Sequence, residues 1–194
     1  MSLPQNAARK SLLALGLAFA ALGAHAESDL NTASGANMSA AARLDFRVTV
    51  PRILFLQVGA GSFADDTTVS LVDWTMTAAQ LNTPGAIAAT AGGAVSARVL
   101  GNGGNINFSA NGLAGGPVAA GVGAIPWSNF SAAVSGGTLP HPAIGNGVAG
   151  ANSPLTAVAG VVNQAATWTF SYANAAPIAA GVYTGRVAYT AVMP

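Results

Sequence analysis

Few residues of this chain could carry out acid–base or metal chemistry. Only 7% of its 194 residues are charged, there is no Cys, and no Asp, Glu, Lys or Arg lies between Arg98 and Arg186. General acids and bases, cages for hard metal ions and clamps for phosphate are built from those side chains. Nucleic-acid binding needs a cluster of Lys and Arg, which the sequence lacks. The composition therefore predicts a protein that is not an enzyme, holds no cofactor and binds no nucleic acid.

The acidic residues Asp65, Asp66 and Asp73 are the one carboxylate cluster that could approach a metal ion. Extracellular calcium sites use carboxylates on turns, but this cluster lacks the D-x-D-x-D-G spacing of a calcium loop. The sequence favours a solvated turn between strands. A weak calcium site at these three residues remains open.

His141 is the only His that follows residue 25, and it lies between Pro140 and Pro142. A zinc site needs further His, Cys or carboxylate ligands near it, and a catalytic His needs a carboxylate to orient it. Neither is found around His141. We therefore expect a residue of a surface turn, and we predict no catalytic residue and no metal ligand in the chain.

The aromatic residues offer a second kind of site, a platform on which a sugar ring could stack. Most of them alternate with polar residues and are expected in the core or in cross-strand pairs. Trp127 differs, because it follows Pro126 in a Gly-rich region. It is the best candidate for an exposed aromatic ring.

The first 26 residues have the order of a secretory signal peptide. Arg9 and Lys10 precede an apolar run, residues 12–22, and the small-x-small sequence Ala24-His25-Ala26 follows. The run is shorter than the ~20 residues of a membrane-spanning helix. We expect cleavage after Ala26, export to the periplasm, the cell surface or the medium, and no membrane span afterwards. The remaining chain holds 5 basic and 6 acidic residues.

A small, polar and flexible leader is expected at residues 27–43, and a single domain at residues 44–194. Leu44, Phe46, Val48 and Val50 alternate with polar residues, which is the period-two pattern of a half-buried strand. Pro51 cannot donate to a sheet and should mark a bulge, an edge or a change of sheet.

Further alternating segments at residues 95–99, 106–110 and 166–172 predict strands, and weaker signals lie at 69–74, 125–130 and 155–162. Between the first two, the sequence Gly101-Asn102-Gly103-Gly104-Asn105 favours a tight hairpin turn. Short strands with turn signals between them indicate an all-β fold, an immunoglobulin-like antiparallel β-sandwich. The strand boundaries within residues 111–163 are not defined by the pattern.

The C-terminal segment GVYTGRVAYTAVMP resembles the last strand of bacterial chaperone–usher fimbrial subunits and of spore-coat-U-like proteins. As in those families, a Gly stands fourteenth from the end and alternating apolar residues follow it. The chain departs from the pattern in three respects: Met193 replaces the penultimate aromatic residue, Pro194 is last, and no disulfide can form. The residues that carry the resemblance are Gly181, Tyr183, Val187, Tyr189 and Ala191.

The resemblance implies a subunit of a surface fibre that assembles with other fimbrial subunits by strand exchange. A periplasmic chaperone would first supply a strand beside the C-terminal one, and the next subunit would then replace it. The candidate donor residues are Leu44, Phe46, Val48 and Val50. Two alternatives stay open: this segment is the first strand of a complete domain, or the protein is a self-contained binding module, including a carbohydrate-binding one.

Overall fold

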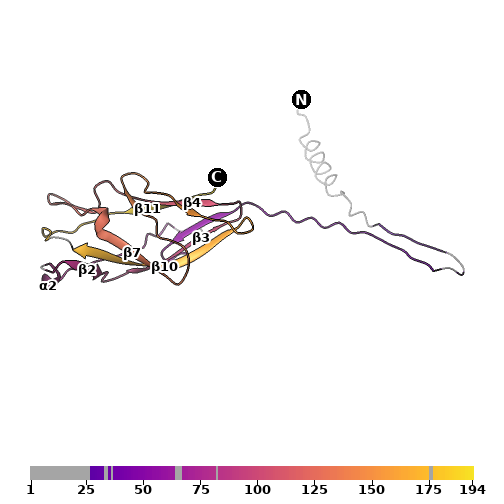
Figure 1. Ribbon diagram of the computed structural model, residues 1–194, viewed down its shortest axis with the longest axis horizontal. Coiled ribbons are helices and arrows are strands. Elements are labelled where there is room, and N and C mark those ends of the chain that lie inside the picture. The colour runs from indigo at the N-terminus through magenta and orange to yellow at the C-terminus, as the bar shows by residue number, and fades with distance from the viewer. Residues whose placement is uncertain (1–26, 33–34, 36, 64–66, 82, 175–176) are drawn as a thin grey trace, which may run out of the picture. The chain divides into compact units, whose positions relative to one another are not determined.

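The computed structural model describes residues 27–32, 35, 37–63, 67–81, 83–174 and 177–194. The predicted signal peptide, residues 1–26, lies outside these residues. The chain divides into two units, Met1–Val50 and Pro51–Pro194. In the second unit, nearly all regular structure is β-strand (Figure 1). No helix among the described residues is long and apolar enough to cross a membrane.

One sheet of the second unit is built around its longest strand, β10 (Val162–Asn174). On one side β10 pairs with β3 (Ala94–Gly101) and β2 (Gly85–Ala88), and on the other with β7 (Phe130–Ser135). The strand β1 (Leu54–Val58) pairs with β3. All these pairs are antiparallel, and β1, β2 and β7 each pair with another strand on one side only.

The second sheet is centred on β4 (Ile106–Gly112). On one side β4 pairs antiparallel with β11 (Val187–Val192). Beyond β4 lie β8 (Ile144–Asn146), which is parallel to it, and β9 (Ser153–Leu155), which is antiparallel. The smaller elements are the pair β5 (Val118–Ala119) and β6 (Gly123–Ala124), the helix α2 (Ala78–Leu81) and the 3₁₀ turn η1 (Trp127–Asn129).

Residues from both sheets form one apolar core, which confirms the predicted all-β sandwich. Period-two burial places Val99 of β3, Phe108 of β4 and Trp168 of β10 inside, each with no exposed surface. The rings of Phe108 and Trp168 stack with centroids 6.1 Å apart. The alternating pattern was thus a reliable guide in the strands that lie at the centres of the sheets.

The predicted hairpin at residues 101–105 is wrong. The strands β3 and β4 that flank this turn belong to different sheets, so the Gly-rich segment is a corner from one sheet to the other. The side chain of Asn102 holds the start of β1: its amide donates to the carbonyl of Pro51 (2.8 Å), and its oxygen accepts from the N–H of Ile53 (2.8 Å). A turn residue therefore fixes the entry of the chain into the domain.

Three weaker predictions of strands also need correction. Residues 69–74 form no strand, only an isolated bridge between Asp73 and Ala91. Within residues 125–130, η1 takes the place of most of the expected strand, and β7 begins only at Phe130. The segment 155–162 contains the end of β9, a turn closed by the pair Val158–Val161, and the start of β10. In the second and third cases a 3₁₀ turn or a tight turn interrupts a sequence that the pattern presents as one strand.

The strand predicted at residues 44–50 is not formed within this chain. No regular structure is assigned there, and the compact unit begins at Pro51, whereas the sequence placed its start at residue 44. The first strand of the sandwich is β1, from the continuous apolar run that follows the Pro. The hypothesis that residues 44–50 are the first strand of a complete domain is therefore wrong.

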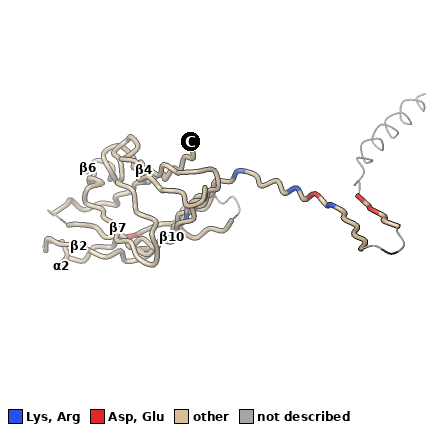
Figure 2. The backbone as a smooth tube through the Cα atoms, turned by 45° about the vertical axis from the view of Figure 1, so that its right-hand side comes forward, with Lys and Arg blue, Asp and Glu red and all other residues tan. Residues whose placement is uncertain are grey.

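Charged residues are concentrated in the N-terminal segment, and the compact unit has few (Figure 2). Arg98 lies within β3, as expected, and its guanidinium lies 4.9 Å from the ring centroid of Phe63. Arg186 immediately precedes β11. The uncharged stretch between these two arginines therefore forms most of the sandwich itself. Its surface must be hydrated by polar uncharged side chains and backbone amides.

Candidate functional site

The residues singled out in the C-terminal segment separate into two groups. Val187, Tyr189 and Ala191 lie in β11 on one face and are half-buried, while the residues between them are exposed. Gly181 and Tyr183 precede the strand. The hydroxyl of Tyr183 donates to the carbonyl of Ala179 (3.0 Å), and its ring packs against a second, smaller apolar cluster. The predicted strand is thus confirmed only from residue 187 onward.

One edge of β11 is unpaired. The strand bonds to β4 on one side, and no other strand of the described residues pairs with it. The same is true of β1, which bonds only to β3. The Cα atoms of β1 and β11 approach within 8 Å of each other. The two sheets therefore present neighbouring edges with free backbone N–H and C=O groups, the arrangement to which a further strand can add.

Apolar side chains line these two edges and are only partly covered. We call this set the seam: it is half-buried and packs against the main core. Because these side chains face inward from edge strands, the core is left open along this side of the sandwich. The seam comprises Leu56 and Val58 of β1, Tyr189 and Ala191 of β11, and Met193.

The start of the compact unit lies beside the end of β11. The guanidinium of Arg52 donates to the carbonyl of Pro194 (3.3 Å), and the N–H of Gly103 contacts the sulfur of Met193 at 3.1 Å. Since Asn102 holds Pro51 at the same corner, β1 begins where β11 ends. The two edge strands therefore run in opposite directions along the seam.

The candidate donor residues carry one apolar side chain at every second position, and all are exposed. Leu44 is 69% exposed, Phe46 87%, Val48 85% and Val50 72%. Exposing four large apolar side chains in a row costs free energy that burial would recover. A segment of this kind is typical of a strand that lacks its partner.

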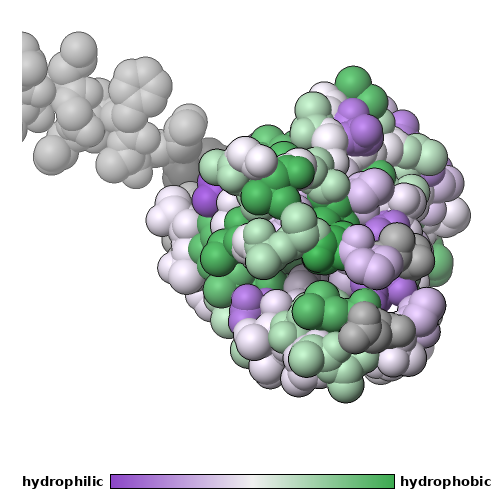
Figure 3. Space-filling model, turned by 90° about the vertical axis from the view of Figure 1, so that its left-hand side faces the viewer, coloured by the Kyte–Doolittle hydropathy of each residue, from purple (hydrophilic) through white to green (hydrophobic). Residues whose placement is uncertain are grey.

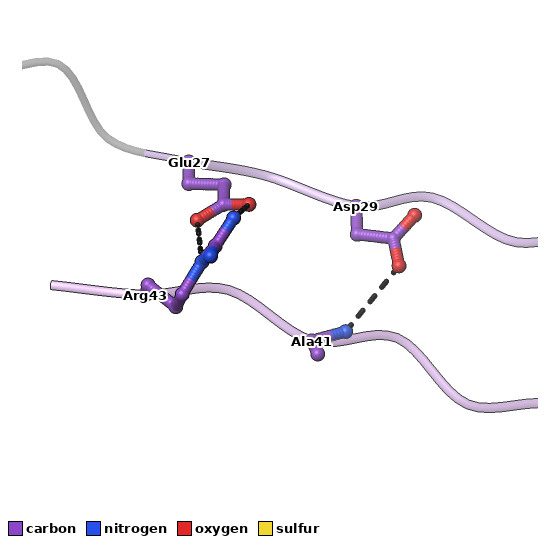
Figure 4. Close-up of polar contacts among 4 residues, drawn as sticks. All are labelled: Glu27, Asp29, Ala41 and Arg43. Carbon is purple, nitrogen blue, oxygen red and sulfur yellow. Dashed lines mark hydrogen bonds and ion pairs between the residues drawn. The ribbon is translucent and has the colours of Figure 1, made fainter.

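The leader that precedes this segment folds back on itself locally (Figure 4). The guanidinium of Arg43 donates to both carboxylate oxygens of Glu27 at 2.7 Å, and the N–H of Ala41 donates to the carboxylate of Asp29 at 3.4 Å. The bond to Arg43 lowers the pKa of Glu27 below its ordinary value. Both partners are exposed, so this ion pair adds little to stability.

The prediction of a surface turn at His141 is wrong. The imidazole points into the sandwich, where its edge packs against the rings of Trp168, Phe170 and Tyr189, with centroids 4.8, 5.2 and 5.7 Å away. Its Nε2 shares a hydrogen bond of 2.9 Å with the hydroxyl of Tyr189. Burial lowers the pKa of His141 to about 4 and raises the pKa of Tyr189 above its ordinary value.

We expect the folded protein to lose stability as the pH falls from about 6.5 to about 4. In this window His141 is protonated in the unfolded chain but not in the folded chain, so the free energy of unfolding decreases as the pH falls. Above about pH 6.5 His141 is neutral in both states and contributes no pH dependence. The expected loss is roughly 1–3 kcal/mol, after a discount for the partly exposed ring. Urea titrations at a series of pH values measure it. His141→Gln should flatten the slope, and an equal slope in both proteins would contradict the assignment.

The acidic cluster gives no support for a calcium site. Asp65 and Asp66 lie outside the described residues, and Asp73 is exposed and makes its bridge to Ala91 through the backbone. The described residues contain no group of three His, Cys, Asp or Glu that could hold a metal ion.

Sequence reasoning missed the β1 half of the seam and most of the lining of a groove beside β7. Leu56 ends the run Ile53-Leu54-Phe55-Leu56, which is apolar on both faces and typical of a buried strand, and Val58 lies two residues beyond it; nothing in this pattern indicates an edge strand. Trp127, the expected exposed ring, is half-buried and does line this groove.

Comparison of the chain with family models, with curated protein sequences and with solved structures finds no match.

Proposed function

We propose that this protein is an exported structural subunit that polymerises by strand addition. Residues 44–50 of one copy would add as a strand to the free edge of β11 in the next copy and cover its seam. The observation that carries the proposal is that one chain contains both an unpaired alternating apolar segment and a half-open core bounded by two edge strands. The apolar segment needs a surface that buries it, and the half-open core needs a strand that covers it.

The chemistry of the two surfaces matches. Residues 44, 46, 48 and 50 present Leu, Phe, Val and Val on one face of an extended strand, and the seam offers half-buried apolar side chains to meet them. Full burial of Phe46 or Val48 contributes about 1.5–3 kcal/mol for each side chain. The backbone of the added strand supplies hydrogen bonds to the free groups of β11, which is β-augmentation.

Pairing between two copies is favoured over pairing within one. Residues 44–50 end at Pro51, which lies beside the end of β11, so a segment folded back into its own seam would run parallel to β11. Such a segment would have to reverse its direction at Pro51, whose carbonyl Asn102 holds, and parallel pairing is the less stable geometry. A segment from another copy can approach antiparallel to β11 without this cost.

Export and assistance by a periplasmic chaperone belong to the same proposal. They rest on the signal-peptide pattern at residues 1–26 and on the resemblance of the C-terminal segment to fimbrial subunits. The immunoglobulin-like character of the sandwich is proposed from its many short antiparallel strands with turns between them. A chaperone strand on β11 would shield the seam until the next copy arrives. The rival hypothesis, a self-contained module, gives no role to the exposed alternating apolar segment at residues 44–50.

The direct test compares the chain that begins at Glu27 with a chain that begins at Pro51. We expect the longer chain to form fibres visible by electron microscopy and to elute from size-exclusion chromatography as a series of oligomers, because each copy carries a donor and an acceptor. The shorter chain should remain monomeric, since it keeps only the seam. A longer chain that stays monomeric, with or without a fimbrial chaperone, would overturn the proposal.

A further inference from the structure

A groove of about 670 Å³ opens on the side of the sandwich away from the seam. It lies between β7, the far edge of the first sheet, and β8, the far edge of the second. Strand addition at β1 and β11 would leave it free. Its volume lies within the ~300–1,000 Å³ of ordinary ligand sites. The lining comprises Gly115, Pro126, Trp127, Ser128, Phe130, Ser131, Ala132, His141, Pro142, Ala143, Ile144 and Asn146.

A rigid aromatic wall forms one side of this groove. The indole N–H of Trp127 donates to the carbonyl of Leu113 (2.8 Å), and its ring lies 5.6 Å from that of Phe130. The ring passes over Gly112, where an added Cβ would collide with it. The orientation of Trp127 is therefore fixed by the fold, and the ring is left partly exposed to solvent or to a ligand.

The polar groups of the groove are all uncharged, and several are unused. The hydroxyl of Ser128 and the amide nitrogen of Asn146 bond to none of the described residues, and the amide oxygen of Asn146 accepts from the N–H of Gly115 at 2.6 Å. His141 uses only Nε2, toward Tyr189, so Nδ1 is available. No lining residue is Asp, Glu, Lys or Arg.

This combination selects a class of ligand. Phosphates, carboxylates and cations are excluded, because each would lose its hydration with no opposite charge to replace it. A flat apolar wall with scattered uncharged donors and acceptors suits a molecule that has one apolar face and many hydroxyl groups. A neutral sugar ring, with C–H groups on its faces and hydroxyls at its rim, has this form.

We propose that the groove between β7 and β8 binds a neutral oligosaccharide, with one ring stacked on Trp127 and its hydroxyls bonded to Ser128 and Asn146. At the end of the compact unit that carries α2 and β2, apolar residues are interspersed with weakly polar and strongly hydrophilic ones (Figure 3). The groove lies at the opposite edges of both sheets from the seam, and the hydrogen bond between His141 and Tyr189 connects the two.

The test uses the chain from Glu27 and a panel of neutral linear trisaccharides of glucose, galactose, mannose and N-acetylglucosamine, with a sialylated trisaccharide beside them. Binding is measured by saturation-transfer NMR and isothermal titration. We expect a neutral member to bind, Trp127→Ala to weaken it roughly tenfold or more, and Ser128→Ala to weaken it roughly 2- to 10-fold.

A second pair of variants keeps the test valid if the loss of Trp127 disturbs the fold. Ala143→Arg fills the groove and should abolish binding, whereas Ala133→Arg places the same side chain at an exposed position of β7 outside the groove lining and should not. Binding should also persist in the non-assembling Phe46→Asp/Val48→Asp chain. The proposal is overturned if no neutral sugar binds or if the sialylated sugar binds best. It is also overturned if binding survives both Trp127→Ala and Ala143→Arg. Occupation of the edge of β7 by an extended peptide alone would overturn it as well.

Discussion

A chain with Asp in place of both Phe46 and Val48 is expected to remain monomeric where the unaltered chain from Glu27 forms fibres. Both side chains are almost fully exposed in the single chain and would face the seam of the next copy. The change removes about 1.5–3 kcal/mol of apolar burial for each residue. It also requires two carboxylates to enter an apolar site, which costs several kcal/mol more. The combined loss exceeds what the added backbone hydrogen bonds could offset.

Thr49→Asp is the matched control for this pair. It introduces the same charge in the same segment, on the alternate face that stays toward water, so assembly should continue. Electron microscopy and sedimentation velocity distinguish the two results. Fibres of normal length from the double variant would show that residues 44–50 are not the donor.

The double variant also tests the direction of assembly. It keeps an intact acceptor, since Leu56, Tyr189 and Ala191 are unchanged, but it cannot donate. Added in small amounts to the unaltered chain, it should bind at one fibre end and shorten the fibres in proportion to its concentration. A synthetic peptide with the sequence of residues 44–50 should bind to the double variant and raise its melting temperature, because a ligand of the folded state stabilises it.

The second large effect is expected at the centre of the core. Trp168→Ala should lower the free energy of unfolding by about 3–5 kcal/mol. The side chain has no exposed surface, stacks on Phe108, and donates its indole N–H to the carbonyl of Leu139 (3.1 Å). Its removal leaves a large cavity and a buried carbonyl without that donor. This loss is a large part of the ~5–15 kcal/mol that a domain usually has.

Urea unfolding followed by circular dichroism measures this loss, in the non-assembling Phe46→Asp/Val48→Asp background so that polymerisation does not contribute. Trp168→Phe should cost less, because it keeps much of the packing and loses the hydrogen bond. Thr169→Ala, the neighbouring residue on the exposed face of β10, should cost less than either. A change below about 1 kcal/mol for Trp168→Ala would contradict the position of this residue in the core.

The two-residue alternation of apolar and polar side chains was enough to predict the central strands from the sequence. In β10, the alternation of Ala166, Trp168 and Tyr172 with polar residues gave both the strand and the face that is buried. This works because a strand with one buried face must repeat every two residues, whatever its partners are. The scarcity of charge likewise predicts, from the sequence alone, that most acid–base and metal chemistry is absent.

Which strands pair, and which do not, required the tertiary structure. The Gly-Asn segment between β3 and β4 has the composition of a hairpin turn, yet the two strands lie in different sheets. Gly permits either path, and the choice depends on where the apolar faces of β3 and β4 can be buried together. His141 shows the same limit. Its two Pro neighbours indicate a turn, but only the packing of distant strands brings it to Trp168 and Tyr189.

The sparsity of chemistry-bearing residues and the alternation of residues 44–50 and 187–192 were determined by the sequence itself. Alternation is a local property, encoded by neighbours along the chain. Whether an alternating segment is a paired strand, an edge or an unpartnered segment is decided by residues far away in sequence. Here the tertiary structure leaves β1 and β11 as neighbouring edges with a half-open core, and it leaves Phe46 and Val48 exposed. The proposed donor and acceptor roles rest on that difference, because two open apolar surfaces gain free energy by burying each other.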